Sequence, residues 1–221
     1  MNPLTIVAVA AAPAFFWLWY FYHQDRYEPE PRLLILRIFF LGMLVTLPVA
    51  LLEGILPISD FLLAVFAAPI IEELAKYLVV ERTVYRSAEF DEPMDGVVYA
   101  AAAALGFATL ENIGYLVSVY LSSPLHDVLF VFALRALLSV PGHALFSSIW
   151  GYGLGRAKFD KKWGYVFILV GLVLAIALHG VFNFFLYSSA ILVLGVFALV
   201  PVIWWLVFRM MDDALRRSPF S

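Results

Sequence analysis

Residues 61–80 read FLLAVFAAPIIEELAKYLVV, an apolar run with two adjacent carboxylates, Glu72 and Glu73, in its middle and Lys76 one turn later. The run is long enough to cross a bilayer, because about 20 helical residues at 1.5 Å each span the ~30 Å hydrocarbon core. A charged side chain at that depth costs about 2.5–3.5 kcal/mol. Charges kept there despite this cost indicate a functional site inside a membrane.

The composition of the whole chain agrees with a membrane protein. Of its 221 residues, 64% are hydrophobic and only 14% are charged, so most of the surface must face lipid. The net charge of -3 without a basic tract argues against a nucleic-acid partner. The chain has no cysteine, which excludes disulfides, iron–sulfur clusters and a thiol nucleophile.

Apolar runs of about 20 residues predict an all-α, polytopic membrane helix bundle of about seven spans. The first run is expected to remain as a span, because no Lys or Arg precedes it as in a signal peptide. The turn at Tyr187-Ser188-Ser189 is the weakest boundary, so six or eight spans are the alternatives. No soluble segment remains, which predicts a single integral-membrane domain over 1–221. The predicted spans are 3–22, 33–52, 61–80, 94–120, 127–154, 164–187 and 190–209.

The distribution of basic residues predicts the orientation. Lys and Arg outside the spans occur only in the first, third and fifth loops and in the C-terminal tail, which the positive-inside rule places in the cytoplasm. The N-terminus is then outside, and an odd number of spans follows. The basic residues are Arg26, Arg32, Arg82, Arg86, Arg156, Lys158, Lys161, Lys162, Arg209, Arg216 and Arg217.

Glu72, Glu73 and Lys76 have the spacing of an acid–base pair with one counter-charge. Lys76 lies three and four residues after the two acids, so it can reach both but compensate only one. One carboxylate that accepts a proton beside one that remains paired suits acid–base catalysis. Pro69 is expected to open the helix nearby. The alternative is an ion-paired cluster that only fixes helix packing.

Further polar groups occur in the fourth and fifth predicted spans. Glu111 and Asn112 stand in GFATLENIGY (106–115), where the alternative role is an interhelical hydrogen bond. His143 stands in SVPGHALFS (139–147), where Pro141 and Gly142 are expected to bend or loosen the helix. Taken alone, this histidine fits a packing role equally well.

The sixth predicted span carries His179 and Asn183 in LHGVFNFF (178–185), at i and i+4 on one helix face. A histidine that transfers protons and an amide that donates to an oxyanion form a plausible catalytic pair. Counted from the span ends, Glu72, Glu111, His143 and His179 all fall within about 10 Å of mid-bilayer. Their common depth predicts one shared polar cavity.

Three further features fit structural roles. Arg135 is either a counter-charge or a side chain that snorkels outward, and we favour the structural role. Gly151 and Gly155 form a GxxxG pattern that predicts a close helix contact. Acids around Pro93 in FDEPMDG (90–96) fit a helix N-terminus; they are Asp91, Glu92 and Asp95.

Four motifs in order resemble the PrsW family of bacterial intramembrane proteases, relatives of the membrane CAAX-processing and bacteriocin-immunity endopeptidases. EELAK (72–76) matches EExxK, FATLEN (107–112) matches FxxxEN, and the histidine of PGHALFS and His179xxxAsn183 follow. The resemblance runs from about residue 15 to 210 and includes YFYHQDRYEPEP (20–31) and FDEPMDG. It implies a site-1 protease of the bacterial cell membrane that cuts a single-span anti-sigma factor under envelope or antimicrobial-peptide stress. It also suggests supporting roles for Glu92 and Asp95.

The resulting hypothesis is peptide-bond hydrolysis inside the membrane. Glu72, or else Glu73, is the general base, and Lys76 tunes the pair. His143 and His179 position water and transfer protons. Asn183 with a histidine offers an oxyanion hole. In the fourth span, Glu111 acts as a second acid–base group or a ligand, with Asn112 in support.

The cofactor and the function class have alternatives. We expect no required metal, since HExxH is absent; a zinc ion on His143, His179 and Glu111 is the rival mechanism. Buried acids and histidines also occur in proton-coupled transporters, although the chain shows no inverted repeat. A non-catalytic scaffold would leave the common depth unexplained.

Overall fold

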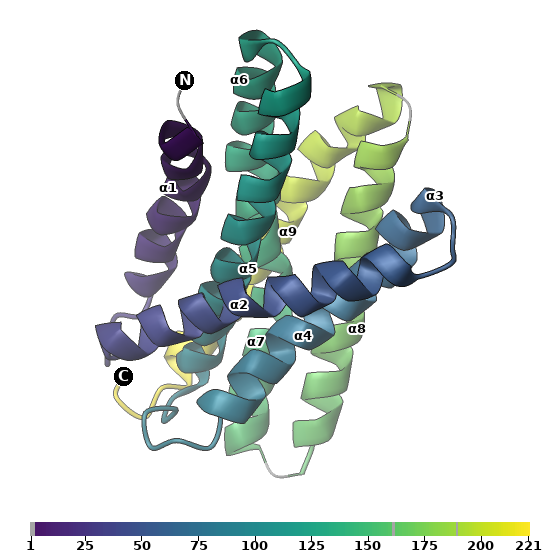
Figure 1. Ribbon diagram of the computed structural model, residues 1–221. Coiled ribbons are helices and arrows are strands. Elements are labelled where there is room, and N and C mark those ends of the chain that lie inside the picture. The colour runs from purple at the N-terminus through teal and green to yellow at the C-terminus, as the bar shows by residue number, and fades with distance from the viewer. Residues whose placement is uncertain (1–2, 161, 189) are drawn as a thin grey trace.

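The computed structural model describes residues 3–160, 162–188 and 190–221, and all regular structure in them is helical (Figure 1). Two π-helical turns, η1 and η2, join α3 to α4 and α6 to α7, so these residues form seven continuous helices. The elements are α1 (Pro3–Tyr22), α2 (Arg32–Ile55), α3 (Asp60–Leu62), η1 (Leu63–Ala67), α4 (Ala68–Thr83), α5 (Pro93–Ser122), α6 (Leu125–Leu134), η2 (Arg135–Ser139), α7 (Val140–Phe159), α8 (Gly164–Tyr187) and α9 (Ala190–Arg216).

The all-α prediction is confirmed, and the seven helices match the seven predicted runs. Among the described residues, six helices are long and apolar enough to cross a membrane. The helix over 60–83 is not one of these six, and it carries the three charges Glu72, Glu73 and Lys76. Two residues used in the sequence analysis, Lys161 of the fifth loop and Ser189 of the last turn, lie outside the described residues.

Helix α5 is the centre of the molecule and packs mainly against α7, α2 and α1. Its alanine run, Ala100–Ala104, is completely buried, and these small side chains allow the other helices to approach closely. The predicted GxxxG contact is confirmed. A Cβ atom on Gly151 or Gly155 of α7 would overlap the α5 backbone at Gly96 or Pro93.

Helix α2 crosses in front of the upright helices α5 and α7 instead of running beside them (Figure 1). Its Phe39 and Gly42 lie directly on α5 at the crossing. The opposite face of α2 exposes large apolar side chains such as Leu33, Leu47 and Leu51, as expected for a surface in contact with lipid.

The first π turn lies just before Pro69. In η1 the N–H of Ala68 bonds to the carbonyl of Leu63, and the next residue is a proline without an N–H. The carbonyl of Ala64 therefore has no donor from its own helix. Asn183 of α8 donates to it instead, with 2.9 Å between Nδ2 and the oxygen.

The second π turn repeats this arrangement just before Pro141. The N–H of Val140 bonds to the carbonyl of Arg135, so the carbonyl of Ala136 lacks a helical donor. Trp17 of α1 donates to it across 3.2 Å from Nε1. The predicted loosening at both prolines is thus present, but as one wider turn in an unbroken helix.

Candidate active site

Lys76 holds both glutamates of α4. Its Nζ lies 3.1 Å from Oε2 of Glu72 and 2.9 Å from Oε1 of Glu73, and its side chain is completely buried. The ring of Phe107 covers the ammonium, with its centroid 4.4 Å away. One buried cation thus faces two carboxylates, as the spacing predicted.

Glu73 is enclosed by donors from three helices. Its Oε2 accepts hydrogen bonds from Ser147 Oγ at 2.7 Å and Trp150 Nε1 at 2.9 Å, both on α7. Its Oε1 accepts from Lys76 and lies 3.0 Å from His179 Nδ1 on α8. With no exposed surface and every oxygen engaged, Glu73 fixes α4, α7 and α8 against one another.

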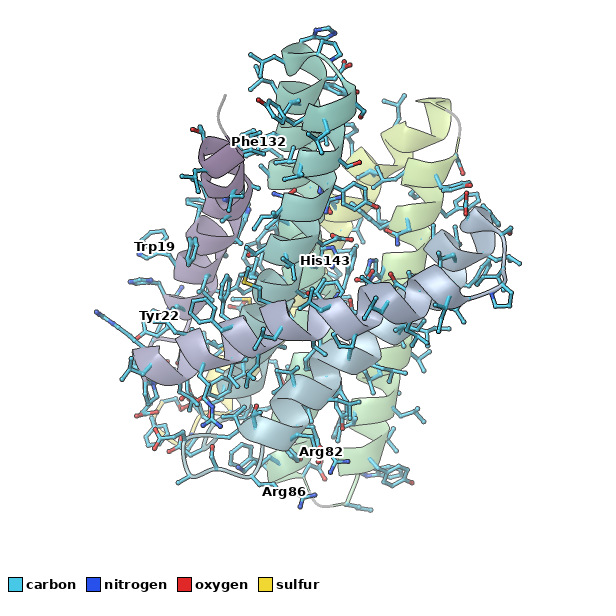
Figure 2. The ribbon with its side chains drawn as sticks, in the orientation of Figure 1. Trp19, Tyr22, Arg82, Arg86, Phe132 and His143 are labelled. Atoms are coloured by element: carbon cyan, nitrogen blue, oxygen red, sulfur yellow. The ribbon has the colours of Figure 1, made fainter. Side chains whose placement is uncertain are left out.

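His143 lies at mid-height in the molecule (Figure 2), between two groups of opposite charge. Its Nδ1 is 3.0 Å from Lys76 Nζ, and its Nε2 is 3.1 Å from Oε2 of Glu111. Because an ammonium only donates, we assign Nδ1 as the acceptor and place the ring proton on Nε2, toward Glu111. Glu72 Oε2 lies 3.6 Å from Nδ1.

Glu111 is paired with Arg135, so the structural snorkelling role favoured for this arginine is wrong. Arg135 Nη2 lies 2.6 Å from Glu111 Oε2, and Arg135 Nε donates to Oδ1 of Asn112 at 2.7 Å. The amide nitrogen of Asn112 donates to the carbonyl of Ala10 in α1 at 2.6 Å. A guanidinium can donate to two planar acceptor groups at once. Glu111 and Asn112 are these acceptors here, and they keep the Arg135 side chain inside the protein.

His179 lies beside His143, with ring centroids 5.1 Å apart. Phe146 stacks on the His179 ring, with centroids 4.8 Å apart. Asn183, one turn later, gives one of its two amide N–H groups to the carbonyl of Ala64. Its second N–H is the one that remains for the predicted oxyanion role.

The predicted shared cavity exists. It has a volume of about 490 Å³ and contains groups from α2, α4, α5, α7, α8 and η2. Its polar lining residues are Glu53, Asp60, Glu72, Glu111, Tyr115, Arg135, Ser139, His143, His179, Asn183 and Tyr187. A neighbouring cavity of about 420 Å³ between α2 and α5 shares Glu53, Glu72, Glu111 and Tyr115 with the first.

Several residues of the site were missed from the sequence, among them Ser147, Trp150 and Glu53. Ser147 and Trp150 follow His143 by one and two helical turns, so helical periodicity from His143 would have found them. Glu53 lines both cavities, and its buried Oε1 has no hydrogen-bond partner. Its place in the sequence, just beyond the end of the predicted span 33–52, gives no signal, because acids are ordinary at span ends.

Two predicted supporting residues lie elsewhere. Glu92 and Asp95 stand at the start of α5, and Asp95 precedes Glu111 by 16 residues, or about 24 Å of helix. Oδ2 of Asp95 accepts from the backbone N–H groups of Asp91 and Glu92 at 2.7 and 2.8 Å. This matches the predicted helix N-terminus, and neither acid lines the shared cavity.

A cation would find a suitable donor set at the site. Glu72, His143 and His179 are all buried and offer one ligand atom each within 4.8 Å of one another. Two imidazoles and one carboxylate are a known zinc set, and Glu73 on His179 Nδ1 is the kind of carboxylate partner that orients a metal-binding histidine. The carboxylate of this possible zinc set is thus Glu72 and not Glu111 as predicted, because Glu111 is paired with Arg135. His143 would exchange one of its present hydrogen bonds for the cation.

Comparison with known proteins gives one family. A family profile described as PrsW family intramembrane metalloprotease matches residues 30–208. Protease PrsW of Geobacillus kaustophilus is 36% identical over 217 residues, which cover 95% of this chain and 92% of the relative. Protease PrsW of Bacillus subtilis is 35% identical over 214 residues, covering 92% and 93%. That of Clostridioides difficile is 31% identical over 230 residues, covering 97% and 93%.

No solved structure matches the chain, so the family assignment rests on these sequences. The description of this family as intramembrane metalloproteases agrees with the six membrane-length helices of the described residues and with the buried glutamate–histidine cluster. The chain belongs to the PrsW family of intramembrane proteases and is a multi-pass peptidase of the bacterial cell membrane.

Proposed function

We propose that this peptidase makes the site-1 cut in a single-span anti-sigma factor, which leads to release of the sigma factor under envelope or antimicrobial-peptide stress. The observation that carries the proposal is the meeting of Glu72, His143 and His179, from three helices, at one buried cavity. Such a cavity can admit water to a peptide bond that lies at membrane depth. The whole chain, 1–221, acts as a single integral-membrane protease domain.

Glu72 is the general base in this proposal. It lines the cavity, whereas Glu73 does not and has both oxygens engaged. Glu72 accepts a proton from water as the water oxygen bonds to the scissile carbonyl carbon. It then returns that proton to the amide nitrogen as the C–N bond breaks. Lys76 stays within 3.1 Å and steadies the carboxylate between these two steps.

The negative oxygen that develops on the scissile carbonyl needs donors nearby. His179 and Asn183 both line the cavity and lie one turn apart on α8. We assign them the oxyanion role, with Glu73 keeping the His179 ring in place through Nδ1. His143, held by Glu111, passes protons between the cavity and the carboxylates.

A zinc-dependent form of the same reaction is the second candidate, favoured by the donor set and by the family description. Glu72, His143 and His179 would hold the ion, which supplies Lewis-acid polarisation of the carbonyl. Glu111, the other cavity-lining carboxylate beside His143, then accepts the proton from water. Loss of cleavage on chelation, with recovery on added zinc, separates this form from the metal-free one.

We further propose that the N-terminus is outside and the C-terminus cytoplasmic. Arg82 and Arg86 lie at the lower end of the molecule in Figure 2. The C-terminal end of α7, the start of α8 and the C-terminus of the chain lie at that end in Figure 1, and the last turn of α7 contains Arg156 and Lys158. Basic residues at one end support a cytoplasmic face.

The absence of native cysteine allows a direct test of this orientation. In intact cells a membrane-impermeant maleimide should label Ser123→Cys, between α5 and α6, and leave Glu89→Cys, between α4 and α5, unlabelled. The reverse pattern contradicts the orientation. Labelling of both variants after the cells are opened controls for accessibility.

The catalytic proposal is tested by reconstituting the chain in liposomes with a single-span tester substrate. The wild type should cleave it. Glu72→Gln and His179→Ala should lower cleavage by on the order of 10²-fold or more, because each removes a group that acts on the reacting atoms. Both variants should remain folded and elute as the wild type does.

Glu81→Gln is the matched control, since Glu81 lies on the same helix but pairs with Arg82 and Arg86 at the surface. It should cleave at the wild-type rate. Undiminished cleavage by Glu72→Gln would remove Glu72 from the mechanism. Proton flux across the liposome without substrate, and without any cleavage, would instead support the transporter alternative.

A further inference from the structure

Four buried carboxylates gather where the connection between α1 and α2 meets the start of α5. Asp25 and Glu30 come from that connection, and Glu92 and Asp95 from the beginning of α5. All four are at most 3% exposed. The cluster lies about 24 Å of helix from Glu111, since 16 residues of α5 separate that residue from Asp95, so it is distinct from the catalytic cavity.

Most oxygens of this acidic cluster have no partner. Oδ2 of Asp95 accepts two backbone N–H groups, and the hydroxyl of Tyr99 donates to Oε2 of Glu30. Both oxygens of Asp25, Oδ1 of Asp95 and Oε1 of Glu30 have no hydrogen-bond partner, and the Glu92 side chain meets only the backbone N–H of Asp95, in a capping box. Buried carboxylate oxygens are rarely left in this condition, because the lost hydration is not replaced.

No protein cation is paired directly with the cluster. Throughout residues 3–160, 162–188 and 190–221, no Lys, Arg or His forms an ion pair with any of the four acids. Lys158, which reaches this end from α7, donates instead to the carbonyl oxygens of Tyr85 and Ser87 at 2.8 and 3.1 Å. The cluster is therefore neutralised either by bound protons or by a cation that the protein itself does not supply.

The geometry suits one ion. Asp25, Glu92 and Asp95 each offer an oxygen within 4.8 Å of the other two. Two oxygens that bind the same Ca²⁺ at 2.3–2.6 Å can be at most about 5 Å apart, so a single ion can touch all three. A donor set of carboxylate oxygens only selects hard cations such as Ca²⁺, Mg²⁺ or Mn²⁺ over zinc.

We propose that Asp25, Glu92 and Asp95 bind one hard divalent cation, with Glu30 beside it, and that this cation ties the α1–α2 connection to the start of α5. Asp95 then has two roles, with Oδ2 ordering the helix start and Oδ1 facing the ion. Burial and the neighbouring acids raise the pKa of Asp25 to about 9 and that of Glu30 to about 10. Protons are thus the competing way to neutralise the cluster.

Binding of Mn²⁺ to the full chain in detergent tests the proposal by electron paramagnetic resonance. A His143→Ala/His179→Ala background removes both imidazole donors of the catalytic cavity, and the further Asp25→Asn change then shows which Mn²⁺ belongs to the acidic cluster. This protein, stripped with chelator, should bind one Mn²⁺ per chain. Adding Asp25→Asn should weaken binding by about tenfold or more, because ligand charge sets the affinity of such sites.

Glu89→Gln is the control, since Glu89 is an exposed acid in the loop just before α5, and it should leave Mn²⁺ binding unchanged. Added Ca²⁺ should raise the thermal unfolding midpoint of the wild type and of Glu89→Gln, but not of Asp25→Asn. If Asp25→Asn does not fold, Glu92→Gln removes a ligand from the other side of the site. The proposal is overturned if the His143→Ala/His179→Ala protein binds no Mn²⁺, or if adding Asp25→Asn or Glu92→Gln leaves Mn²⁺ binding as before.

Discussion

Adjacent residues of α4, Glu72 and Glu73, have opposite surroundings. Glu73 points into the contact between α4, α7 and α8, where four side-chain donors reach it. Glu72 lines the cavity and receives one hydrogen bond from Lys76. A carboxylate that must accept and release protons needs the cavity environment of Glu72. The enclosed environment of Glu73 instead suits a positioning residue.

This difference predicts different losses on substitution. Glu73→Gln places an amide NH₂ among donors and leaves a buried ammonium with one partner fewer, so it should destabilise the fold by about 3–5 kcal/mol. Ser147→Ala removes one hydrogen bond to a charged acceptor and should cost about 1.5–3 kcal/mol. Thermal unfolding in detergent checks the order. A Glu73→Gln variant as stable as Glu72→Gln would contradict the positioning role.

At the residue scale, depth in the membrane was the useful signal. It identified Glu72, Glu111, His143 and His179, because an ionisable group at mid-bilayer needs a reason to be there. It could not identify Ser147 and Trp150, whose types are ordinary in a packed helix. Arg135 was misread for a related reason. Its two acceptors stand 23 and 24 residues earlier in the chain, and spacing alone does not show that they face it.

At the scale of elements, the two π turns depend on donors from other helices. Asn183 reaches the carbonyl left free in η1 and Trp17 the one in η2, and both contacts bridge 119 residues of sequence. A proline predicts that a helix is disturbed, but whether it breaks or only widens depends on such partners. The sequence therefore located the disturbance at Pro69 and Pro141 without giving its form.

The ends of the helices were easier to predict from the sequence than their internal turns. The predicted spans 61–80 and 94–120 lie within the observed helices Asp60–Thr83 and Pro93–Ser122.

A double-mutant cycle checks the role of Asn183 in η1. Asn183→Leu should lower stability by about 1 kcal/mol or more, because it leaves the half-buried Ala64 carbonyl without a protein donor. Pro69→Ala restores a backbone N–H five residues after that carbonyl, so it should recover much of the loss in the double variant. The measurement is thermal unfolding of the four proteins. Strictly additive effects would mean that Asn183 does not act through this carbonyl.

At the scale of the whole molecule, the crossing of α2 over α5 creates a path to the catalytic groups. The cavity between these helices shares Glu53, Glu72, Glu111 and Tyr115 with the catalytic cavity. The sequence predicted α2 as a span but not its direction, which follows from the close contacts of Gly42 and Gly106 with the facing backbone. Those glycines form no motif that could be recognised in advance.

A pair of glycine variants tests whether the substrate uses this path. A Cβ atom on Gly114 or on Gly54 would meet nothing within 4 Å, so both sites accept a larger side chain without strain. Only Gly114 lines the cavity between α2 and α5. Gly114→Leu should therefore reduce cleavage of the membrane tester about tenfold, by obstructing the positioning of its peptide bond, while Gly54→Leu cleaves normally. Equal rates for the two variants would place substrate entry elsewhere.

The π turn at Leu63–Ala67 has a consequence for how the family can vary in length. A π turn holds one residue more than an α turn, so the helix on either side keeps its facing when that residue is removed and an ordinary turn takes its place. Asp60 and the paired acids would then still meet their present neighbours. By contrast, a deletion between Ala68 and Glu72 would rotate the acids by about 100° relative to everything before it. Relatives that keep the catalytic pair are therefore expected to differ by a single residue at this turn and not in the segment that follows it.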